Sequence, residues 1–143
     1  MSKYYIVFIK PGDKLDIAGA QIEAVHAYNI KRCRPSGRLW HIKGDGVGYI
    51  LTIEGKKIYH AGDNEFIPEM RNLGHIDLAL LPIDGTFTMS IKEAAKAAIA
   101  IKPSVVIPMH NQKSDPNESK DELESMSNIK IIVLQPGESF GLK

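Results

Sequence analysis

Three side chains with metal-binding chemistry follow predicted strands at widely separated points of the chain. His26, Asp63 and His110 each come after a segment rich in apolar and β-branched residues. Strand ends can bring residues that are distant in sequence to one edge of a sheet. Imidazole and carboxylate are ligands that zinc, manganese and iron accept, and strand ends hold them rigidly. The pattern therefore predicts a metal site with His26, Asp63 and His110 as its ligands.

Each of these residues also has an ordinary structural explanation when it is taken alone. A histidine at a strand end is more often a hydrogen-bonding loop residue, and an aspartate after glycine is more often a turn former. His41, which follows Trp40 in a predicted loop, is an alternative to His26, although the strand-end position favours His26. His60 and His75 are not predicted to be ligands, because His60 can orient its neighbours and His75 begins a strand at a turn.

The sequence around these candidates resembles the metallo-β-lactamase superfamily from about residue 11 onward. The resemblance rests on GVGY at 46–49, HAGD at 60–63 and IPMH at 107–110. Within the superfamily the chain is similar to the ascorbate-6-phosphate-lactonase-like and uncharacterised metal-dependent hydrolases of prokaryotes. The resemblance implies that Asp63 bridges two metal ions, that His110 binds the second metal, and that His26 binds the first.

One motif of that superfamily is absent from this sequence. None of the five histidines belongs to an H-x-H-x-D-H motif, which in the family supplies two ligands to each metal and precedes the region where this chain begins. Without it each metal would have two protein ligands, whereas catalytic zinc typically has three and a water. We therefore expect an incomplete dinuclear site that binds zinc or manganese weakly by itself.

Three interpretations of the function follow from this incomplete site. In the first, the chain is the C-terminal half of a metal-dependent hydrolase and is inactive alone, and another chain that carries H-x-H-x-D-H completes the site. In the second, the chain is a non-catalytic binding or interaction protein whose partial site is vestigial. In the third, a homodimer assembles a different metal site across its interface from His26, His41, Asp63 and His110 and acts as a weak esterase or phosphoesterase. The sequence identifies no catalytic residue within the chain.

The elements that would position these residues are strands in the first half of the chain and alternating strands and helices in the second. This order predicts an α/β protein with one mixed sheet and helices on one face, in a single domain over residues 1–143. The resemblance identifies it as half of an αββα sandwich. The clearest helix is expected at 91–101, because Ser90 and Glu93 form a capping-box pattern. Strands are predicted at 3–10, 15–17, 21–25, 47–53, 56–60, 76–83, 104–109, 130–134 and 139–142, with further helical segments at 68–73 and 119–126.

Composition excludes several classes of function. A hydrophobic fraction of 43% with 24% charged residues is typical of a globular protein, and no apolar run reaches the length of a membrane span. The net charge of +1 gives no field that would attract nucleic acid. The single cysteine, Cys33, and the lack of a signal-peptide pattern favour the cytoplasm.

The predicted loop at 30–46 is rich in basic side chains. Its cations could recognise a small anionic substrate, consistent with phosphorylated sugars among the substrates of the family that it resembles. A solvated basic loop is the more common explanation for such a run of charge. The residues concerned are Lys31, Arg32, Arg34, Arg38 and Lys43.

Overall fold

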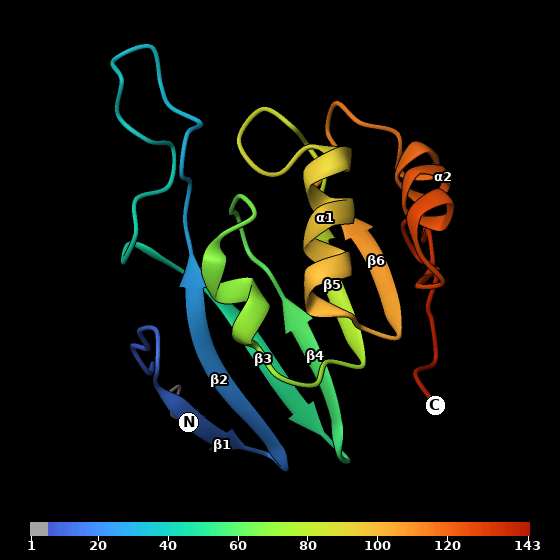
Figure 1. Ribbon diagram of the computed structural model, residues 1–143. Coiled ribbons are helices and arrows are strands. Elements are labelled where there is room, and N and C mark those ends of the chain that lie inside the picture. Colours follow the sequence, from blue (N-terminus) through green and yellow to red (C-terminus); the bar gives the residue numbers. More distant parts are fainter. Residues whose placement is uncertain (1–5) are drawn as a thin grey trace.

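A single mixed β-sheet forms the centre of the structure, a computed structural model that describes residues 6–143 (Figure 1). Its seven strands lie side by side in sequence order. Strands β1 to β4 pair antiparallel, and the pairs from β4 to β7 are parallel. This arrangement confirms the predicted α/β class with one mixed sheet. The strands are β1 (Lys14–Ile17), β2 (Ala20–Ala27), β3 (Gly46–Ile53), β4 (Lys56–His60), β5 (Leu78–Pro82), β6 (Val105–Met109) and β7 (Lys130–Ile131).

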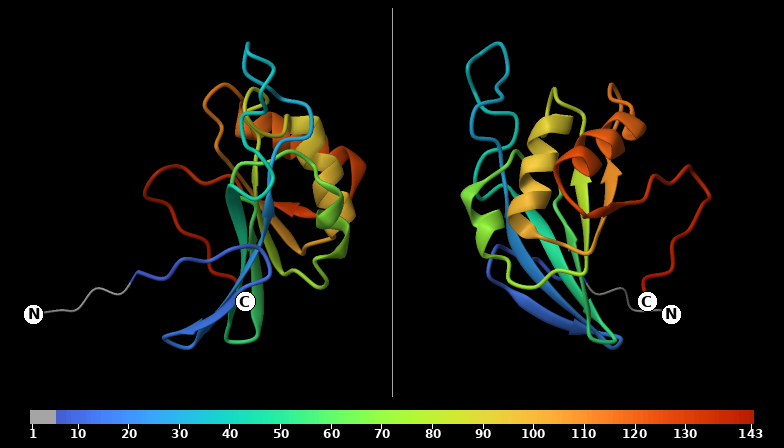
Figure 2. Two further views of the ribbon diagram at one scale, coloured as in Figure 1. Left: turned by 90° about the vertical axis from the view of Figure 1, so that its left-hand side faces the viewer. Right: turned by 45° about the vertical axis from the view of Figure 1, so that its right-hand side comes forward.

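Three helices cover one face of this sheet, as Figures 1 and 2 show. They are the 3₁₀ helix η1 (Pro68–Asn72) and the α-helices α1 (Ile91–Ile101) and α2 (Pro116–Met126). The start of α1 has the predicted capping box, in which Ser90 Oγ accepts from the Glu93 N–H and the Glu93 carboxylate accepts from the Ser90 N–H. Helix α2 begins at Pro116 rather than at residue 119, because Asp115 caps it and proline is pre-organised for a first turn. No helix within residues 6–143 is both long and apolar enough to cross a membrane.

The core lies between the helices and the facing side of the sheet. Residues directly opposite one another on neighbouring strands share a face. One such row contains Ile50, Tyr59, Ala79 and Val106, all of them buried. Burial of this row specifies the register, because a slip of one residue would expose it. Small side chains on α1 let the helix approach the row closely; they are Ala94, Ala95, Ala97 and Ala98.

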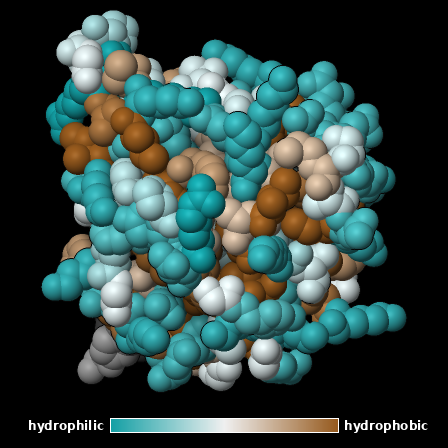
Figure 3. All heavy atoms as spheres, in the orientation of Figure 1, coloured by the Kyte–Doolittle hydropathy of each residue, from teal (hydrophilic) through white to brown (hydrophobic). Residues whose placement is uncertain are grey.

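The opposite face of the sheet is also apolar, but no helix covers it in the part of the chain that the structure describes (Figure 2). Ile22, Tyr49, Leu51 and His60 line a hollow on this face, and each of them is only partly buried. By contrast, hydrophilic side chains dominate the helix-covered face in Figure 3. An apolar sheet face normally packs against a second layer of structure.

Two strand predictions are wrong. Residues 6–10, the described part of the segment predicted at 3–10, form no strand, and Ile6 and Phe8 are exposed; residues 3–5 lie outside the described residues. Residues 139–142 likewise form no strand, and β7 is shorter than the predicted segment at 130–134. Strand propensity expresses fit to a pleated, half-buried surface, so an apolar segment without a neighbouring strand does not form one.

Candidate metal site

Asp63 lies between two histidines at one edge of the sheet. Its Oδ2 is 3.6 Å from His41 Nε2, and its Oδ1 is 3.5 Å from His110 Nε2. Asp63 follows β4 and His110 follows β6. The structure therefore brings two of the three predicted ligands together at strand ends. The third member of the group is His41, from the loop between β2 and β3.

The two distances suit ligands of a common ion better than hydrogen bonds. An N–H···O bond spans about 2.7–3.2 Å, so both contacts are too long for one. Two ligands of one tetrahedral zinc ion, with bonds of about 2.0–2.1 Å, stand about 3.3 Å apart. The spacing therefore fits an ion between Asp63 and each imidazole, with one carboxylate oxygen available to each ion.

The number of donors around each position is small. Within residues 6–143, no group of three or more His, Cys, Asp or Glu side chains is arranged to hold one metal ion. His41, Asp63 and His110 instead make two separate pairs that share Asp63. Asp63 would therefore be the residue shared by two ions, should this site hold a pair of metals. Each ion would have two donors from the described residues, whereas a zinc site has four ligands in total.

Backbone geometry in the HAGD and IPMH segments directs these side chains. Gly62 has a φ of 68°, and a Cβ there would lie 2.8 Å from the Val47 carbonyl oxygen, so only glycine fits before Asp63. The Gly62 N–H donates to His60 Nδ1 (3.1 Å), so His60 accepts a bond from the backbone next to Asp63. His110 has a φ of 50°, in the left-handed region that few residues other than glycine adopt.

His41 is held in place by Asn29, a fully buried residue just beyond β2. Asn29 Oδ1 accepts from the His41 backbone N–H and also lies 2.7 Å from His41 Nδ1. The Asn29 N–H in turn donates to the His41 carbonyl oxygen (2.8 Å). These hydrogen bonds between Asn29 and His41 close the loop, and they leave His41 Nε2 facing Asp63. Asn29 was not predicted as a site residue, because a single amide in a loop carries no pattern in one sequence.

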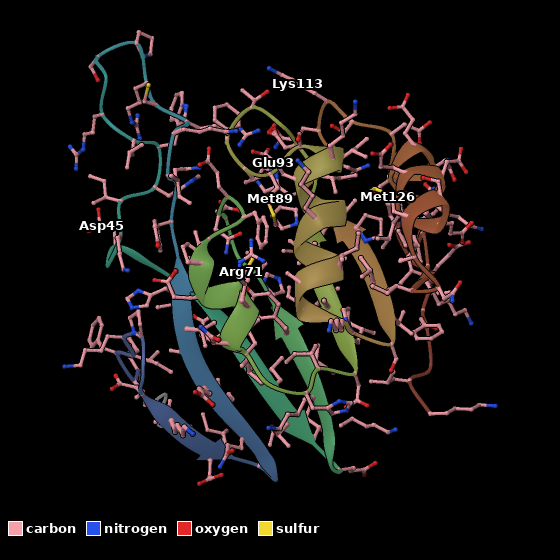
Figure 4. The ribbon with its side chains drawn as sticks, viewed as in Figure 1. Asp45, Arg71, Met89, Glu93, Lys113 and Met126 are labelled. Atoms are coloured by element: carbon pink, nitrogen blue, oxygen red, sulfur yellow. The ribbon has the colours of Figure 1, made fainter. Side chains whose placement is uncertain are left out.

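Glu65 fixes the same loop at its start. Its buried carboxylate accepts from the backbone N–H groups of Ile30, Lys31 and Arg32 at 2.7–2.9 Å. Arg32 Nη1 adds a fourth bond to Glu65 at 2.9 Å. Arg32 also donates to Glu93, near the N-terminal end of α1 (Figure 4). These three residues, Arg32, Glu65 and Glu93, are called the loop clasp below, because they tie the loop that carries His41 to the rest of the fold.

Hydrogen bonds in the loop clasp favour the charged forms of its carboxylates. Burial opposes ionisation of Glu93, but hydrogen bonds from Arg32 and Lys31 outweigh it and lower the pKa of Glu93 to about 2. Burial likewise opposes ionisation of Glu65, and the loop N–H groups together with Arg32 still lower its pKa. Both carboxylates are therefore ionised near neutral pH.

His26, the predicted ligand of the first metal, lies away from this group. Strand β2 continues to Ala27, so His26 is inside the strand, opposite Val47, and not in the loop beyond it. Its ring stands edge-on to Tyr28, with 6.3 Å between centroids. His26 lines a separate hollow together with Glu69, and Asp63 does not line that hollow. His41, which the sequence offered as the alternative to His26, is the histidine that lies beside Asp63.

A hollow of about 450 Å³ opens beside the metal candidates. Its walls include Trp40, His41, Asp45 and Asp63. This volume is in the range of sites that bind small molecules, about 300–1,000 Å³. The Arg34 guanidinium lies 4.6 Å from the centroid of the Trp40 ring, which lines the hollow, although Arg34 itself does not line it.

Sequence comparison gives named relatives along most of the chain. Residues 3–110 match the model of the β-lactamase superfamily domain. The chain is 34% identical over 139 residues to a metal-dependent hydrolase of Methanosarcina mazei, which covers 92% of this chain and 60% of that protein. A metal-dependent hydrolase of Thermococcus onnurineus is 44% identical over 119 residues, which covers 72% of this chain and 52% of that protein.

Solved structures similar to this chain are also described as metal-dependent or metallo hydrolases. A protein described as a metal-dependent hydrolase from Parabacteroides distasonis superposes with a TM-score of 0.79 at 40% identity, covering 87% of this chain and 56% of that one. A metallo hydrolase from Ignicoccus hospitalis gives a TM-score of 0.74 at 32% identity, covering 92% and 58%. The chain therefore spans 52–60% of the length of these four relatives. Since the family match runs through the segments that carry Asp63 and His110, this chain belongs to the β-lactamase superfamily.

Proposed function

We propose that this chain provides half of the dinuclear centre of a metal-dependent hydrolase, and that a segment carrying H-x-H-x-D-H outside these 143 residues supplies the other ligands. The observation that carries the proposal is the position of Asp63, with one imidazole nitrogen 3.5–3.6 Å from each carboxylate oxygen. Relatives at 34% and 44% identity are named metal-dependent hydrolases, which supports the same chemistry here.

His41 and Asp63 Oδ2 would hold the first metal, and Asp63 Oδ1 and His110 the second. Zinc or manganese suits this mixture of imidazole and carboxylate donors. When bound, such a metal acts as a Lewis acid and lowers the pKa of water toward neutrality. The residues of this chain position the donors: Asn29 and the loop clasp hold His41, and Gly62 directs Asp63. Because each metal has two donors here, we expect the chain alone to bind zinc weakly.

The apolar face of the sheet that no helix covers is the place where we expect the complementary segment to pack as a second layer. Ile22, Tyr49 and Leu51 present apolar side chains on the face without a helix. A second β-layer there would bury these side chains and could bring further ligands to the edge where Asp63 lies. We propose a complementary segment in this place, in preference to a second copy of this chain, because a second copy contains no H-x-H-x-D-H.

A small anionic molecule is the substrate class that we propose. Three of the five basic residues of the loop, Lys31, Arg32 and Lys43, pair with glutamates, so their charge already serves to hold the loop. Arg34 stacks on Trp40, a lining residue of the hollow, and forms no ion pair within residues 6–143. Its guanidinium is therefore available to an anionic group of the substrate.

Reconstitution tests the proposal. The purified chain should bind less than one equivalent of zinc, as measured by plasma mass spectrometry after gel filtration. Mixed with a polypeptide that carries H-x-H-x-D-H, it should bind two equivalents and hydrolyse chromogenic phosphodiesters, esters or lactones. The part of the Methanosarcina mazei hydrolase that this chain does not match is the first complement to try.

Substitution of Asp63 supplies the matched control. Asp63→Asn should remove zinc from both positions of the mixture, because the amide does not bridge two cations. Asp16→Asn, at an exposed position on β1, should leave zinc content unchanged. Two equivalents of zinc in the chain alone would contradict the proposal. A complex that forms without zinc, with the same affinity for Asp63→Ala, would instead identify a non-catalytic binding protein with a vestigial site.

A further inference from the structure

We propose that Asn29 is a positioning residue for His41: its amide holds the imidazole in the Nδ1-protonated tautomer, so that the lone pair of Nε2 faces Asp63. The inference deepens the proposed function, since it takes His41 as the ligand of the first metal. Asn29 is fully buried, and the effect of its hydrogen bonds on His41 can be measured without metal.

The surroundings of Asn29 determine which way its amide points. Asn29 Nδ2 donates to the Phe87 carbonyl oxygen at 2.8 Å, and Oδ1 accepts from the His41 backbone N–H at 2.7 Å. A carbonyl can only accept and a backbone N–H can only donate. A flipped amide would place oxygen against oxygen and N–H against N–H, so the usual ambiguity between the amide atoms does not arise here.

The fixed amide in turn determines the tautomer of His41. Asn29 Oδ1 is an acceptor without a hydrogen, and it lies 2.7 Å from His41 Nδ1. Two acceptors at this distance would repel each other, so Nδ1 carries the proton. In the neutral ring Nε2 is then unprotonated and directs its lone pair toward Asp63 Oδ2, 3.6 Å away. This is the tautomer that binds metal through Nε2.

Without Asn29 the opposite tautomer would be favoured. A carboxylate near an imidazole nitrogen attracts a proton to that nitrogen, and Asp63 faces Nε2. A ring with its proton on Nε2 has no lone pair there for a metal. Asp63 alone would favour a proton on Nε2, whereas Asn29 favours a proton on Nδ1. Asn29 therefore determines the tautomer of His41 in addition to closing the loop.

Nuclear magnetic resonance of the metal-free chain measures this directly. Long-range ¹H–¹⁵N correlation of ring nitrogens, at a pH where the rings are neutral, distinguishes protonated from unprotonated nitrogen. Wild type should show His41 protonated at Nδ1. Asn29→Ala should move the proton to Nε2. Asn29→Asp keeps an acceptor for Nδ1, and burial favours a protonated carboxyl whose O–H can donate to the Phe87 carbonyl oxygen, so this variant should retain the wild-type tautomer. The ring signals of His75, at an exposed position, should not change in either variant.

Zinc titration followed on the same ring signals gives a second readout. Loss of a hydrogen-bonded partner behind a metal ligand typically lowers metal affinity about 10–100-fold. Asn29→Ala should show a loss of this size at His41, and Asn29→Asp should stay close to wild type.

The outcomes separate this inference from the proposed function. An Nε2-protonated His41 in wild type, or an unchanged tautomer in Asn29→Ala, would overturn the role of Asn29. If Asn29→Ala does not fold, the tautomers of wild type and Asn29→Asp decide, because both are expected to be protonated at Nδ1. Should the tautomers be as expected while zinc does not bind near His41, the positioning by Asn29 stands and the proposed metal site fails.

Discussion

Replacement of Glu65 by alanine is expected to be strongly destabilising, although Glu65 lies in an irregular segment. Glu65 is 2% exposed, and its carboxylate accepts four hydrogen bonds, three from consecutive backbone N–H groups and one from Arg32. Alanine would leave these donors without an acceptor in a place that water reaches poorly. It would also remove one of the two carboxylates that neutralise Arg32.

The size of the effect follows from these contacts. A hydrogen bond to a charged group contributes about 1.5–3 kcal/mol, and simple addition over four bonds would give about 6–12 kcal/mol. Addition overestimates the loss, because the loop N–H groups can move to meet water once the carboxylate is gone. Removal of one partner from a buried ion pair costs about 3–5 kcal/mol. Since Glu93 still pairs with Arg32, we expect a loss near the lower end, about 3–4 kcal/mol.

Urea denaturation followed by circular dichroism measures this loss as a change in the free energy of unfolding. Glu124→Ala, at an exposed position of α2, is the control and should change stability by less than about 0.5 kcal/mol. Hydrogen exchange should become faster in the loop between β2 and β3 of the Glu65→Ala variant. A loss below about 1 kcal/mol would refute the reasoning, because the clasp would then not hold the loop.

Three further predictions concern pH, packing and metal binding. The pKa of Glu93 is about 2 in the folded protein against an ordinary 4.5, so its contribution to stability is complete above about pH 5 and is lost as the pH falls toward 2. Between pH 5 and pH 2, the free energy of unfolding should therefore fall less for Glu93→Gln than for wild type. In Gly48→Ala the new Cβ would lie 2.9 Å from a backbone carbonyl oxygen, so thermal denaturation should show a loss of stability of about 1–3 kcal/mol. Gly141→Ala is the control, because no atom lies within 4 Å of its Cβ, and its stability should be near that of wild type. In the reconstituted mixture His41→Ala should lower zinc content by about one equivalent and His26→Ala should not; the reverse result would restore His26 as the ligand.

The helix start and the positions of Asp63 and His110 at strand ends could be predicted because local sequence determines them. Ser90 and Glu93 are three residues apart, and their capping box depends on no distant contact. Asp63 and His110 follow strands whose apolar composition is evident in the sequence, and the mixed sheet places those strand ends at one edge.

The place of His41 beside Asp63 could not be predicted in the same way, because tertiary contacts determine it. His41 reaches Asp63 only because Asn29 and Glu65 hold a long irregular loop against the sheet. The basic residues of that loop were predicted as one group, yet three of them pair with glutamates, and Arg34 and Arg38 form no ion pair within residues 6–143. Such pairings join residues far apart in the chain and leave no periodic pattern.

Zinc-edge anomalous diffraction locates bound metal without reference to activity. Crystals of the chain soaked in excess zinc should give peaks beside the Asp63 carboxylate, one toward His41 Nε2 and one toward His110 Nε2, with none at His26. Zinc at His26 together with no peak near Asp63 would contradict the shared-carboxylate site, and with it the proposal that this chain carries half of a metal-dependent hydrolase centre.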